Sequence, residues 1–443
     1  MTSIEPALNT RRLPPISGML DELVDQAVRA RRRRVMAADQ PGQTLAALQV
    51  SDDTLDRCVT ALRIYGDDAA HALNDRLQHG SESEREAAAF VRLALAVQRS
   101  EPQLATLAAE LTASHPRAVH EALWFFPCPG TPLAERNDHI DGLLAAAVQG
   151  LLPMELALRL TGQRDAGRLR AQVLEYREGA QAPFAAYALA ALGVDDDALR
   201  GFVDEHLHGT DATLCAAALE AVAVHPALAA TEALLSCVAH HPCHVTDPAW
   251  AALCSRDPRL ACEVATQDKT LPPELTARLL ALRGDLCSLV DLAAVLLERN
   301  APALPHEADT LLLILGELPA ELMSTDASAD QRSKALRQLL LRVCRHAHVG
   351  VRNDADLAPW SPEALFDEPT QVKALRLRFG QRLSAMPALP PLLMRLTHGL
   401  RQWLYVERAW LMRRRLSLSA WDVARRQVLA LSVAETMDEL PAG

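Results

Sequence analysis

Helical segments rich in Ala and Leu alternate with short turns along most of the sequence, and this alternation constrains the fold more than any other feature. Stretches such as SEREAAAFVRLALAVQRS (83–100) and TDATLCAAALEAVAVHP (210–226) carry apolar residues at the spacing of an α-helix. Aromatic residues make up only 4% of the chain, so Ala and Leu, two strong helix formers, supply most of the apolar volume. Runs of alternating β-branched and aromatic residues, which are typical of strands, are absent. The sequence therefore predicts an all-α fold.

Capping and turn residues mark the expected helix ends. Helices are predicted to begin at SDD (51–53) and SHP (114–116), because a capping side chain or an early Pro suits a helix N-terminus. The aspartates at 195–197 are predicted to open a helix, where acids favour the positive end of its dipole. Gly66 and Gly80 are predicted to close helices, since Gly can adopt the left-handed conformation common there.

A short motif recurs, in which an X-Pro turn opens an Ala/Leu-rich helix. It is found at four places: His115-Pro116, His225-Pro226, His241-Pro242 and Asp257-Pro258. Between about residue 50 and residue 320, each expected pair of helices takes about 25 to 35 residues, and such pairs stack to bury a shared core. We therefore predict an irregular HEAT-like α-solenoid of stacked helix pairs, with a globular multi-helix bundle as the alternative.

The predicted organisation has three parts. Residues 1–50 form an N-terminal helix and linker, in which a first helix starts near Ser17 and ends with the basic run RARRRR (29–34). Residues 51–325 form the HEAT-like repeats, and residues 326–443 form a C-terminal helical region with a basic patch.

Charge is distributed unevenly along the chain. Residues 371–426 contain twelve Lys or Arg but only two acids, Glu407 and Asp422, a net charge of +10. The whole chain carries −11, so the remaining residues sum to −21. A candidate interaction surface lies in the basic stretch, with these residues as its members: Arg401, Trp403, Arg408, Arg413, Arg414 and Arg415.

Three interpretations of this basic stretch remain open. Basic residues interleaved with aromatics can bind phosphates and stack on bases. They can also bind the acidic surface of a partner protein. Because the aromatics of WLYVERAWL (403–411) recur at helical spacing, they can equally pack internally or dock on an acidic surface of the same chain. We favour packing or docking, then a protein partner, then nucleic acid.

The stretch CVAHHPCH (237–244) concentrates side chains that bind metals. His241 already has a structural explanation, because it belongs to one of the X-Pro turns, and Cys237 falls on an apolar helix face. The remaining candidate zinc ligands are His240, Cys243, His244 and Cys254. Structural zinc usually requires paired Cys at C-x₂₋₄-C spacing, which is absent here. We therefore predict a helix corner without a metal or cofactor.

No standard catalytic motif is present. The sequence lacks phosphate-binding glycine loops, H-E-x-x-H and G-x-S-x-G, so a non-catalytic protein is predicted. Cys58, Cys215, Cys262, Cys287 and Cys344 fall on apolar helix faces and are predicted to be small hydrophobes. No run of about 18 uncharged apolar residues suggests a membrane span. With no secretory signal visible in MTSIEPALNTRRLPPISG, we expect a cytoplasmic protein.

Both ends of the sequence resemble an uncharacterised bacterial family of HEAT-repeat-like proteins found with type VI secretion gene clusters. The N-terminal resemblance lies in DDTLDRCVTALRIYGDDAAHALNDRLQHGSESEREAAAFVRLAL (52–95) and HPRAVHEALWFFP (115–127). Its matching positions are Leu55, Asp56, Arg57, Leu62, Gly66, Leu123, Trp124 and Pro127. The C-terminal resemblance lies in LPPLLMRLTHGLRQWLYVERAWLM (389–412), with matches at His398, Gly399, Gln402 and Arg408. The chain departs from the family by carrying Trp403, Tyr405 and Trp410, where small or polar residues are more usual.

The resemblance implies an accessory, immunity or scaffolding role near a secretion system and supplies no catalytic residues. Two hypotheses follow. The first is a protein–protein interaction scaffold or adaptor that binds a secretion-system component or effector. The second is a nucleic-acid-binding or DNA base-repair protein that uses the basic C-terminal helices.

Overall fold

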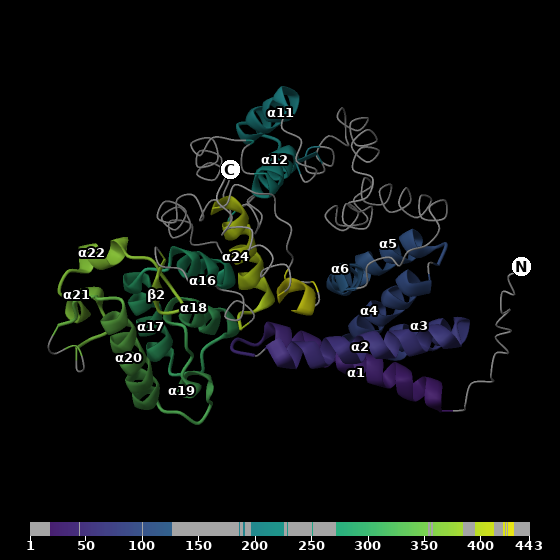
Figure 1. Ribbon diagram of the computed structural model, residues 1–443, viewed down its shortest axis with the longest axis horizontal. Helices are drawn as coiled ribbons and strands as arrows, with labels where there is room; N and C mark the ends of the chain where they lie inside the picture. Colours follow the sequence, from purple (N-terminus) through teal and green to yellow (C-terminus); the bar gives the residue numbers. More distant parts are fainter. Residues whose placement is uncertain are drawn as a thin grey trace, which may run out of the picture. The chain divides into compact units, whose positions relative to one another are not determined.

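The computed structural model of the 443-residue chain is helical almost throughout the part that it describes (Figure 1). It describes residues 18–43, 45–99, 101–125, 186, 189–190, 196–225, 228, 250, 272–352, 355, 358–383, 395–411, 420, 422 and 424–428. Within these ranges, extended pairing is limited to a two-stranded hairpin and an isolated bridge between Val351 and Phe366. The predicted all-α class is therefore confirmed. None of the described helices is long and apolar enough to cross a membrane.

The chain divides into two compact units. Unit 1 comprises Met1–Arg33 and Ser51–Thr131, and unit 2 comprises Arg34–Val50 and Pro132–Gly443. These bounds differ from the predicted ones, because the structure groups residues 34–50 with the C-terminal part of the chain. Ala38 and Leu48 are buried in one small cluster with Ala424, a contact between residues almost 400 positions apart that sequence patterns do not reveal.

Two long helices contribute to both units, and four further helices belong to unit 1. The elements are α1 (Met19–Asp39), α2 (Leu45–Tyr65), α3 (Asp67–His79), α4 (Glu82–Arg99), α5 (Leu104–Ser114) and α6 (Pro116–Phe125). As predicted, α2 and α3 end at Gly66 and Gly80, and α6 begins at Pro116. Gly66 has a positive φ of 61°, but Gly80 is extended at φ −72°, so the left-handed conformation predicted for Gly80 is wrong. The predicted start at 51–53 is wrong, since these residues lie inside α2. There the buried Leu48, Leu55 and Leu62 continue one apolar stripe that overrides the capping signal.

The first helix starts near the predicted position but ends later than predicted. It continues five residues past Arg34, to Asp39. Arg31 and Arg34 are buried, whereas Arg29, Arg32 and Arg33 are exposed. The basic run is thus an ordinary two-faced helical segment rather than a helix terminus.

Unit 1 is built around α4. This helix packs on both α3 and α6, and α5 packs on α6, so neighbouring helix pairs stack as a solenoid predicts. Every residue of α4 from 87 to 97 is buried, however. A helix in an open two-layered array keeps one solvent-facing stripe, whereas one that is apolar all round is surrounded. In the described part of unit 1, α1 adds to the cover, since Arg31 lies over the ring of Phe90, 4.5 Å from its centroid.

The described helices of unit 2 lie in two stretches. The first holds α11 (Asp197–Leu207) and α12 (Ala212–Val224), which pack together. Asp196 caps α11 by accepting a hydrogen bond from the Leu199 N–H at 2.8 Å, as predicted for the run of aspartates. The second stretch holds α16 (Pro273–Arg283), α17 (Leu286–Arg299), α18 (Pro305–Leu315), α19 (Ala320–Met323), α20 (Ala329–His346), α21 (Pro362–Leu365), α22 (Pro369–Ala374), β1 (Leu377–Arg378), β2 (Gln381–Arg382) and α24 (His398–Leu411).

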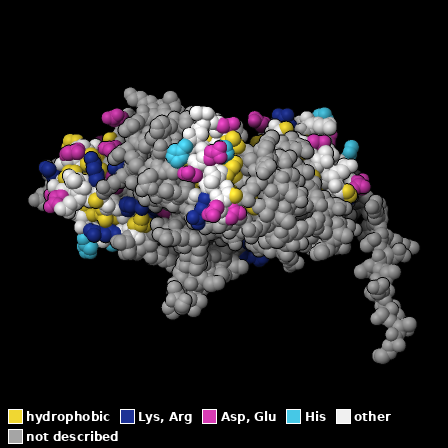
Figure 2. Space-filling view, turned by 90° about the horizontal axis from the view of Figure 1, so that it is seen from above, with side chains coloured by type: hydrophobic (Ala, Val, Ile, Leu, Met, Phe, Trp, Pro, Cys, Tyr) yellow, Lys and Arg dark blue, Asp and Glu magenta, His cyan; other side chains and the backbone are white. Residues whose placement is uncertain are grey.

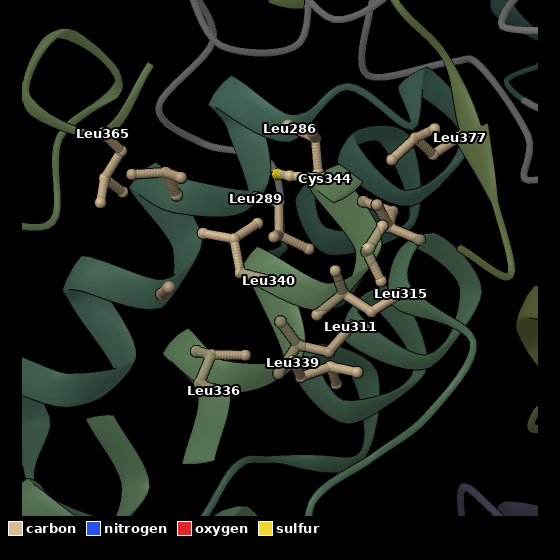
Figure 3. Packing of buried hydrophobic residues seen from close by; sticks show 14 of the residues in the cluster. Leu286, Leu289, Leu311, Leu315, Leu336, Leu339, Leu340, Cys344, Leu365 and Leu377 are labelled. Atoms are coloured by element: carbon tan, nitrogen blue, oxygen red, sulfur yellow. The ribbon is translucent and has the colours of Figure 1, made fainter. Parts of the chain in front are cut away.

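The core of the second stretch forms where α17, α18 and α20 meet (Figure 3). Leu289 of α17, Leu311 of α18 and Leu340 of α20 are fully buried there, and the sulfur of Cys344 lies among leucine side chains. Like α4, α18 is buried along its length, from residue 307 to residue 315. The strands β1 and β2 pair in antiparallel register, with Leu377 opposite Arg382.

The solenoid arrangement itself is not confirmed. Pair stacking is present locally, but a buried-all-round helix in each unit and the contact between residues 34–50 and the C-terminal segment are features of a globular multi-helix bundle. These features come from tertiary contacts, so the helical spacing of the sequence cannot distinguish the two arrangements.

Candidate functional site

The predicted interaction surface falls largely on α24 and the residues after it. Arg401 and Trp403 are 0% and 2% exposed, so the prediction that they lie on a surface is wrong. The alternative interpretation, internal packing, describes both residues. The side chains of Arg408, Arg413, Arg414 and Arg415 lie outside the described residues, so their role stays a prediction.

The candidate zinc ligands His240, Cys243, His244 and Cys254 also lie outside the described residues. Among the residues that the structure does describe, no group of three or more His, Cys, Asp or Glu could hold a metal ion. Four of the cysteines predicted on apolar faces, Cys58, Cys215, Cys287 and Cys344, are buried and form no disulfide, as predicted, and the fifth, Cys262, lies outside the described residues. Burial raises the pKa of Cys287 and of Cys344 to about 12, so neither thiol ionises near neutral pH.

Glu407 of α24 anchors the first of two buried polar groupings. Its Oε1 accepts hydrogen bonds from Arg376 at 3.0 Å and from Arg378 at 2.9 Å, and the Glu407 and Arg378 side chains are nearly inaccessible to solvent. The carboxylate thus compensates two guanidinium groups that the β-hairpin brings into the core. Two arginines on one oxygen make a charge-assisted network rather than a simple pair.

The same arginines cap the C-terminus of α16. Both Arg376 and Arg378 donate to the carbonyl of Leu282, at 2.9 and 2.6 Å. The last carbonyls of a helix lack intrahelical partners and carry the negative end of its dipole, so cations satisfy them well. Gly284 closes α16 at φ +68°, and a Cβ at this position would collide with the Arg378 guanidinium. The grouping therefore requires both a left-handed residue and the absence of a side chain here.

Asp309 of α18 anchors the second grouping, at the N-terminus of α24. Its carboxylate accepts hydrogen bonds from the Thr397 backbone N–H, at 3.1 and 3.3 Å, and from the Thr397 hydroxyl. Asp309 is only 2% exposed, and burial raises its pKa to about 7. The two Thr397 contacts and the charges of Arg278 and Arg401 oppose this rise.

Close packing between α24 and α16 positions these charges. Gly399 lies against the guanidinium of Arg278, and a Cβ at this glycine would overlap its Nη2 and Cζ atoms. Gly399 therefore lets Arg278 approach the first turn of α24, beside the buried Asp309. The glycine is needed here for close approach rather than for its φ angle.

The first turn of α24 also connects to the end of α1. The His398 side chain is 3% exposed, and its Nδ1 lies 3.8 Å from the Asp39 carboxylate. The Gly42 N–H donates to the Arg395 carbonyl at 2.7 Å, and Arg34 donates to the Asp422 carbonyl at 3.2 Å. These contacts, with the small cluster around Ala38, explain why residues 34–50 group with the C-terminal segment.

The basic stretch 371–426 is therefore largely engaged within the chain where the structure describes it. Besides Arg376 and Arg378, Arg382 donates to the Ala347 carbonyl at 2.8 Å, and Arg395 donates to the Gly316 carbonyl at 3.3 Å. Arg426 pairs with Asp422 at 2.9 Å. Lys373 and Arg425 remain exposed.

The carboxylates at the centre of these groupings, Glu407 and Asp309, were not predicted as site residues from the sequence. Glu407 was counted only as one of two acids in a basic stretch, and Asp309 was not singled out. A signal did exist, since both acids interrupt apolar helical runs, in WLYVERAWL and HEADTLLLIL. An acid at a buried helical position needs a cation or a donor from elsewhere in the fold. The arrangement serves to hold α24 against α16 and α18.

Comparisons with known proteins identify no relative. No family model, no curated protein and no solved structure matches the chain. The likeness to HEAT-repeat-like proteins of secretion clusters therefore stays a prediction from the residues quoted above.

Proposed function

We propose that the protein is a non-catalytic protein–protein interaction scaffold or adaptor. The observation that carries this proposal is the engagement of the basic C-terminal stretch within the chain itself. The arginines described in this stretch bind the buried Glu407 carboxylate and carbonyls at helix ends, so they stabilise the fold of the chain itself. The exposed faces of the helices then remain the surfaces on which the chain can bind partner proteins.

The same observation weighs against the nucleic-acid alternative. Binding along a phosphate backbone needs accessible cations, and base stacking needs accessible aromatic rings. Arg401, Trp403 and Tyr405 are all buried, and Tyr405 donates to Gln427 at 2.8 Å. A chain with net charge −11 also repels a polyanion except at a local basic surface.

A narrower proposal rests on the resemblance alone. The quoted residues at both ends support an accessory role in a bacterial type VI secretion system, with a component or effector of that system as partner. We also propose a cytoplasmic location, in keeping with a non-catalytic adaptor. Neither proposal has support from relatives.

Affinity purification of the full-length chain from a bacterium that encodes it tests the proposal. We expect one protein to co-purify in a fixed ratio and to remain bound in a second purification with both proteins produced recombinantly. An unrelated acidic helical protein with the same tag serves as control. Failure to recover a stable partner from several growth conditions would overturn the scaffold proposal.

A binding experiment with duplex DNA distinguishes the alternative. Fluorescence anisotropy of the intact chain with a labelled duplex, at low and at physiological salt, should show weak binding that salt abolishes. Tight binding that survives physiological salt would favour the nucleic-acid function instead.

A further inference from the structure

Residues 332–352 contain a second segregation of positive charge, outside the basic C-terminal stretch. Six Lys or Arg occur there without an Asp or Glu, together with His346 and His348. Most of the segment forms α20, a helix whose inner face contributes Leu336, Leu340 and Cys344 to the core of unit 2. Its cations therefore have to divide between an inner and an outer face.

Three of the six cations donate to main-chain carbonyls of neighbouring loops, among them Arg352, whose Nε donates to the Phe366 carbonyl at 3.3 Å. Arg332 is 2% exposed and donates to the Ser324 carbonyl at 2.8 Å. Arg337 donates to the Ala355 carbonyl and lies over the ring of Trp360, 4.7 Å from its centroid. Arg332 and Arg337 thus stabilise the loops around α20 and are not available to a partner.

The other cations form an exposed stripe. Lys334, Arg342 and Arg345 are exposed on one side of α20, with more than two turns between Lys334 and Arg342, and the exposed His346 follows Arg345. Beyond the helix end, His348 is exposed, and the Nε atom of Arg382 donates to the Ala347 carbonyl. We name this set the α20 stripe, with these members: Lys334, Arg342, Arg345, His346, His348 and Arg382. At the left of the view in Figure 2, exposed Lys, Arg and His side chains lie among Asp and Glu side chains.

Local stability explains only part of the stripe. Arg345 and His346 suit the negative end of the helix dipole, and Arg382 satisfies carbonyls at the helix end. Lys334, however, lies more than two turns before that end. Arg342 and Arg345 are like charges three positions apart, which destabilises a helix slightly. The Arg342–Glu317 ion pair is 2.9 Å long, but its side chains are 53% and 60% exposed, so it compensates little.

We propose that the α20 stripe is a docking surface for an acidic α-helix of a partner protein. The inference rests on the scaffold function and assigns it a surface and a partner chemistry. Lys334, Arg342 and Arg345 are 8 and 3 residues apart, which is about 12 Å and about 4.5 Å along the helix axis at about 1.5 Å per residue, and carboxylates with the same sequence spacing on a second helix recur at the same intervals. A helix laid alongside α20 can therefore match the stripe over its full length.

A protein helix fits these observations better than a phosphate backbone. The large apolar side chains exposed in the described ranges include no aromatic residue, so nothing beside the stripe offers a base a stacking surface. The overall charge of −11 repels a long polyanion, whereas a short acidic helix meets only the local surface.

Anisotropy titrations of the full-length protein with three labelled probes test the proposal. The first is a helix-forming peptide with Glu at i, i+4, i+8 and i+11, the second is the same composition with the Glu residues spread around the helix, and the third is a DNA duplex. We expect the ordered peptide to bind about tenfold more tightly than the scattered one at low salt, and binding to weaken as salt rises.

Matched variants localise the binding. The charge-removal variant K334Q/R342Q/R345Q should lose about tenfold in affinity for the ordered peptide, and the charge-reversal variant K334E/R342E/R345E should lose more. The control variant R29Q/R32Q/R33Q removes three exposed cations from α1 and should bind as the unmodified protein does. Circular dichroism melts establish that each variant is folded.

Three outcomes would overturn the docking surface: no binding of the ordered peptide, equal loss in the α1 control, or tighter binding of DNA than of peptide through the same residues. The test is separate from that of the scaffold function. If a natural partner co-purifies equally with the K334Q/R342Q/R345Q variant, the scaffold stands and the α20 stripe fails. If the peptide binds the stripe but no natural partner exists, the surface chemistry holds and the scaffold fails.

Discussion

Glu121 of unit 1 and Asp309 of unit 2 are both buried carboxylates, but the surrounding residues compensate them differently. In unit 1, the two oxygens of Glu121 each face an arginine at 2.8 Å, Arg31 on one side and Arg117 on the other. In unit 2, the Asp309 oxygens are bonded to the backbone and hydroxyl of Thr397, and arginines contribute only through their nearby charge. Glu121 is therefore compensated by ion pairs, as is Glu407 of unit 2, whereas Asp309 is compensated mainly by hydrogen bonds at a helix terminus.

Because their partners differ, the two buried acids should respond differently to mutation and to pH. A buried ion pair is costly to break, because removing one partner leaves the other charge in a region of low dielectric constant. A carboxylate held mainly by neutral donors loses less when neutralised, but its ionisation is penalised by burial, which raises the pKa of Asp309. We therefore expect mutation of Glu121 to lower the free energy of unfolding. We expect a change of pH to alter the contribution of Asp309 to that free energy.

The largest effect is expected for Glu121→Gln. The change leaves the buried Arg31 without its carboxylate and should lower the free energy of unfolding of unit 1 by about 3 kcal/mol or more. Chemical denaturation with hydrogen exchange, to assign the loss to unit 1, measures it. The double variant R31M/E121L should recover most of the stability, since apolar residues often replace a buried pair well. A loss below 1 kcal/mol for Glu121→Gln would contradict the assignment.

A smaller loss, about 2 kcal/mol, is expected for Glu407→Gln. The change removes the charge shared by Arg376 and Arg378, but both arginines keep their hydrogen bonds to carbonyls of α16. Thermal unfolding of the variant provides the measurement, and Arg378→Lys should behave similarly because lysine cannot span the same acceptors. Stability equal to that of the unmodified protein would show that the carbonyl contacts alone suffice.

Asp309 should make the stability of unit 2 depend on pH. Its folded-state pKa of about 7 lies above the unfolded value of 3.8, so the folded state holds the additional proton between these pH values. The free energy of unfolding should therefore fall as pH rises through this window, by at most about 1.4 kcal/mol per pH unit, and level off above pH 7.

The variant Asp309→Asn removes this titration. The free energy of unfolding of the variant minus that of the unmodified protein should be highest at pH 8 and lowest near pH 5. Urea unfolding at pH 5, 6, 7 and 8 measures the difference, and Asp326→Asn, an exposed acid of the same unit, is the matched control. A pH-independent difference between the two proteins would refute the raised pKa.

The smallest effects are expected at surface ion pairs, where the two units should behave alike. The variants Asp67→Asn in unit 1 and Glu317→Gln in unit 2 remove partners of Arg99 and Arg342. Because Asp67 and Glu317 are both well exposed, each change should alter stability by less than about 0.5 kcal/mol. A larger loss in one unit, measured by denaturation, would show that its outer network contributes to the fold.

Local signals predicted the helices well where no long-range contact competed with them. Pro116 opens α6, Asp196 caps α11, and Gly66 follows α2, because capping and turn chemistry act within a few residues. The start predicted at 51–53 failed because an apolar stripe extends through it. The loss of Arg401 and Trp403 from the predicted surface has the same origin, since tertiary packing decides which face of α24 meets solvent.

The candidate sites show this limit more sharply. The six Lys and Arg residues of segment 332–352 can be counted in the sequence. Which of them are buried, as Arg332 is, and which are exposed, as Lys334 is, depends on where α20 packs. Equally, no local pattern joins Asp309 to Thr397, 88 positions later, or Arg34 to Asp422. These contacts depend on the path of the whole chain.

Sequence patterns were sufficient to predict the all-α class, the places where several helices begin and end, and the packing of Cys58, Cys215, Cys287 and Cys344 as hydrophobes. These properties follow from spacing and capping, which act over one or two helical turns. Only the tertiary structure decided that α4 and α18 are buried all round, that residues 34–50 belong with the C-terminal segment, and which arginines face inward. A buried charge needs a compensating partner, and where that partner comes from a distant segment, as Thr397 does for Asp309, only the fold supplies it.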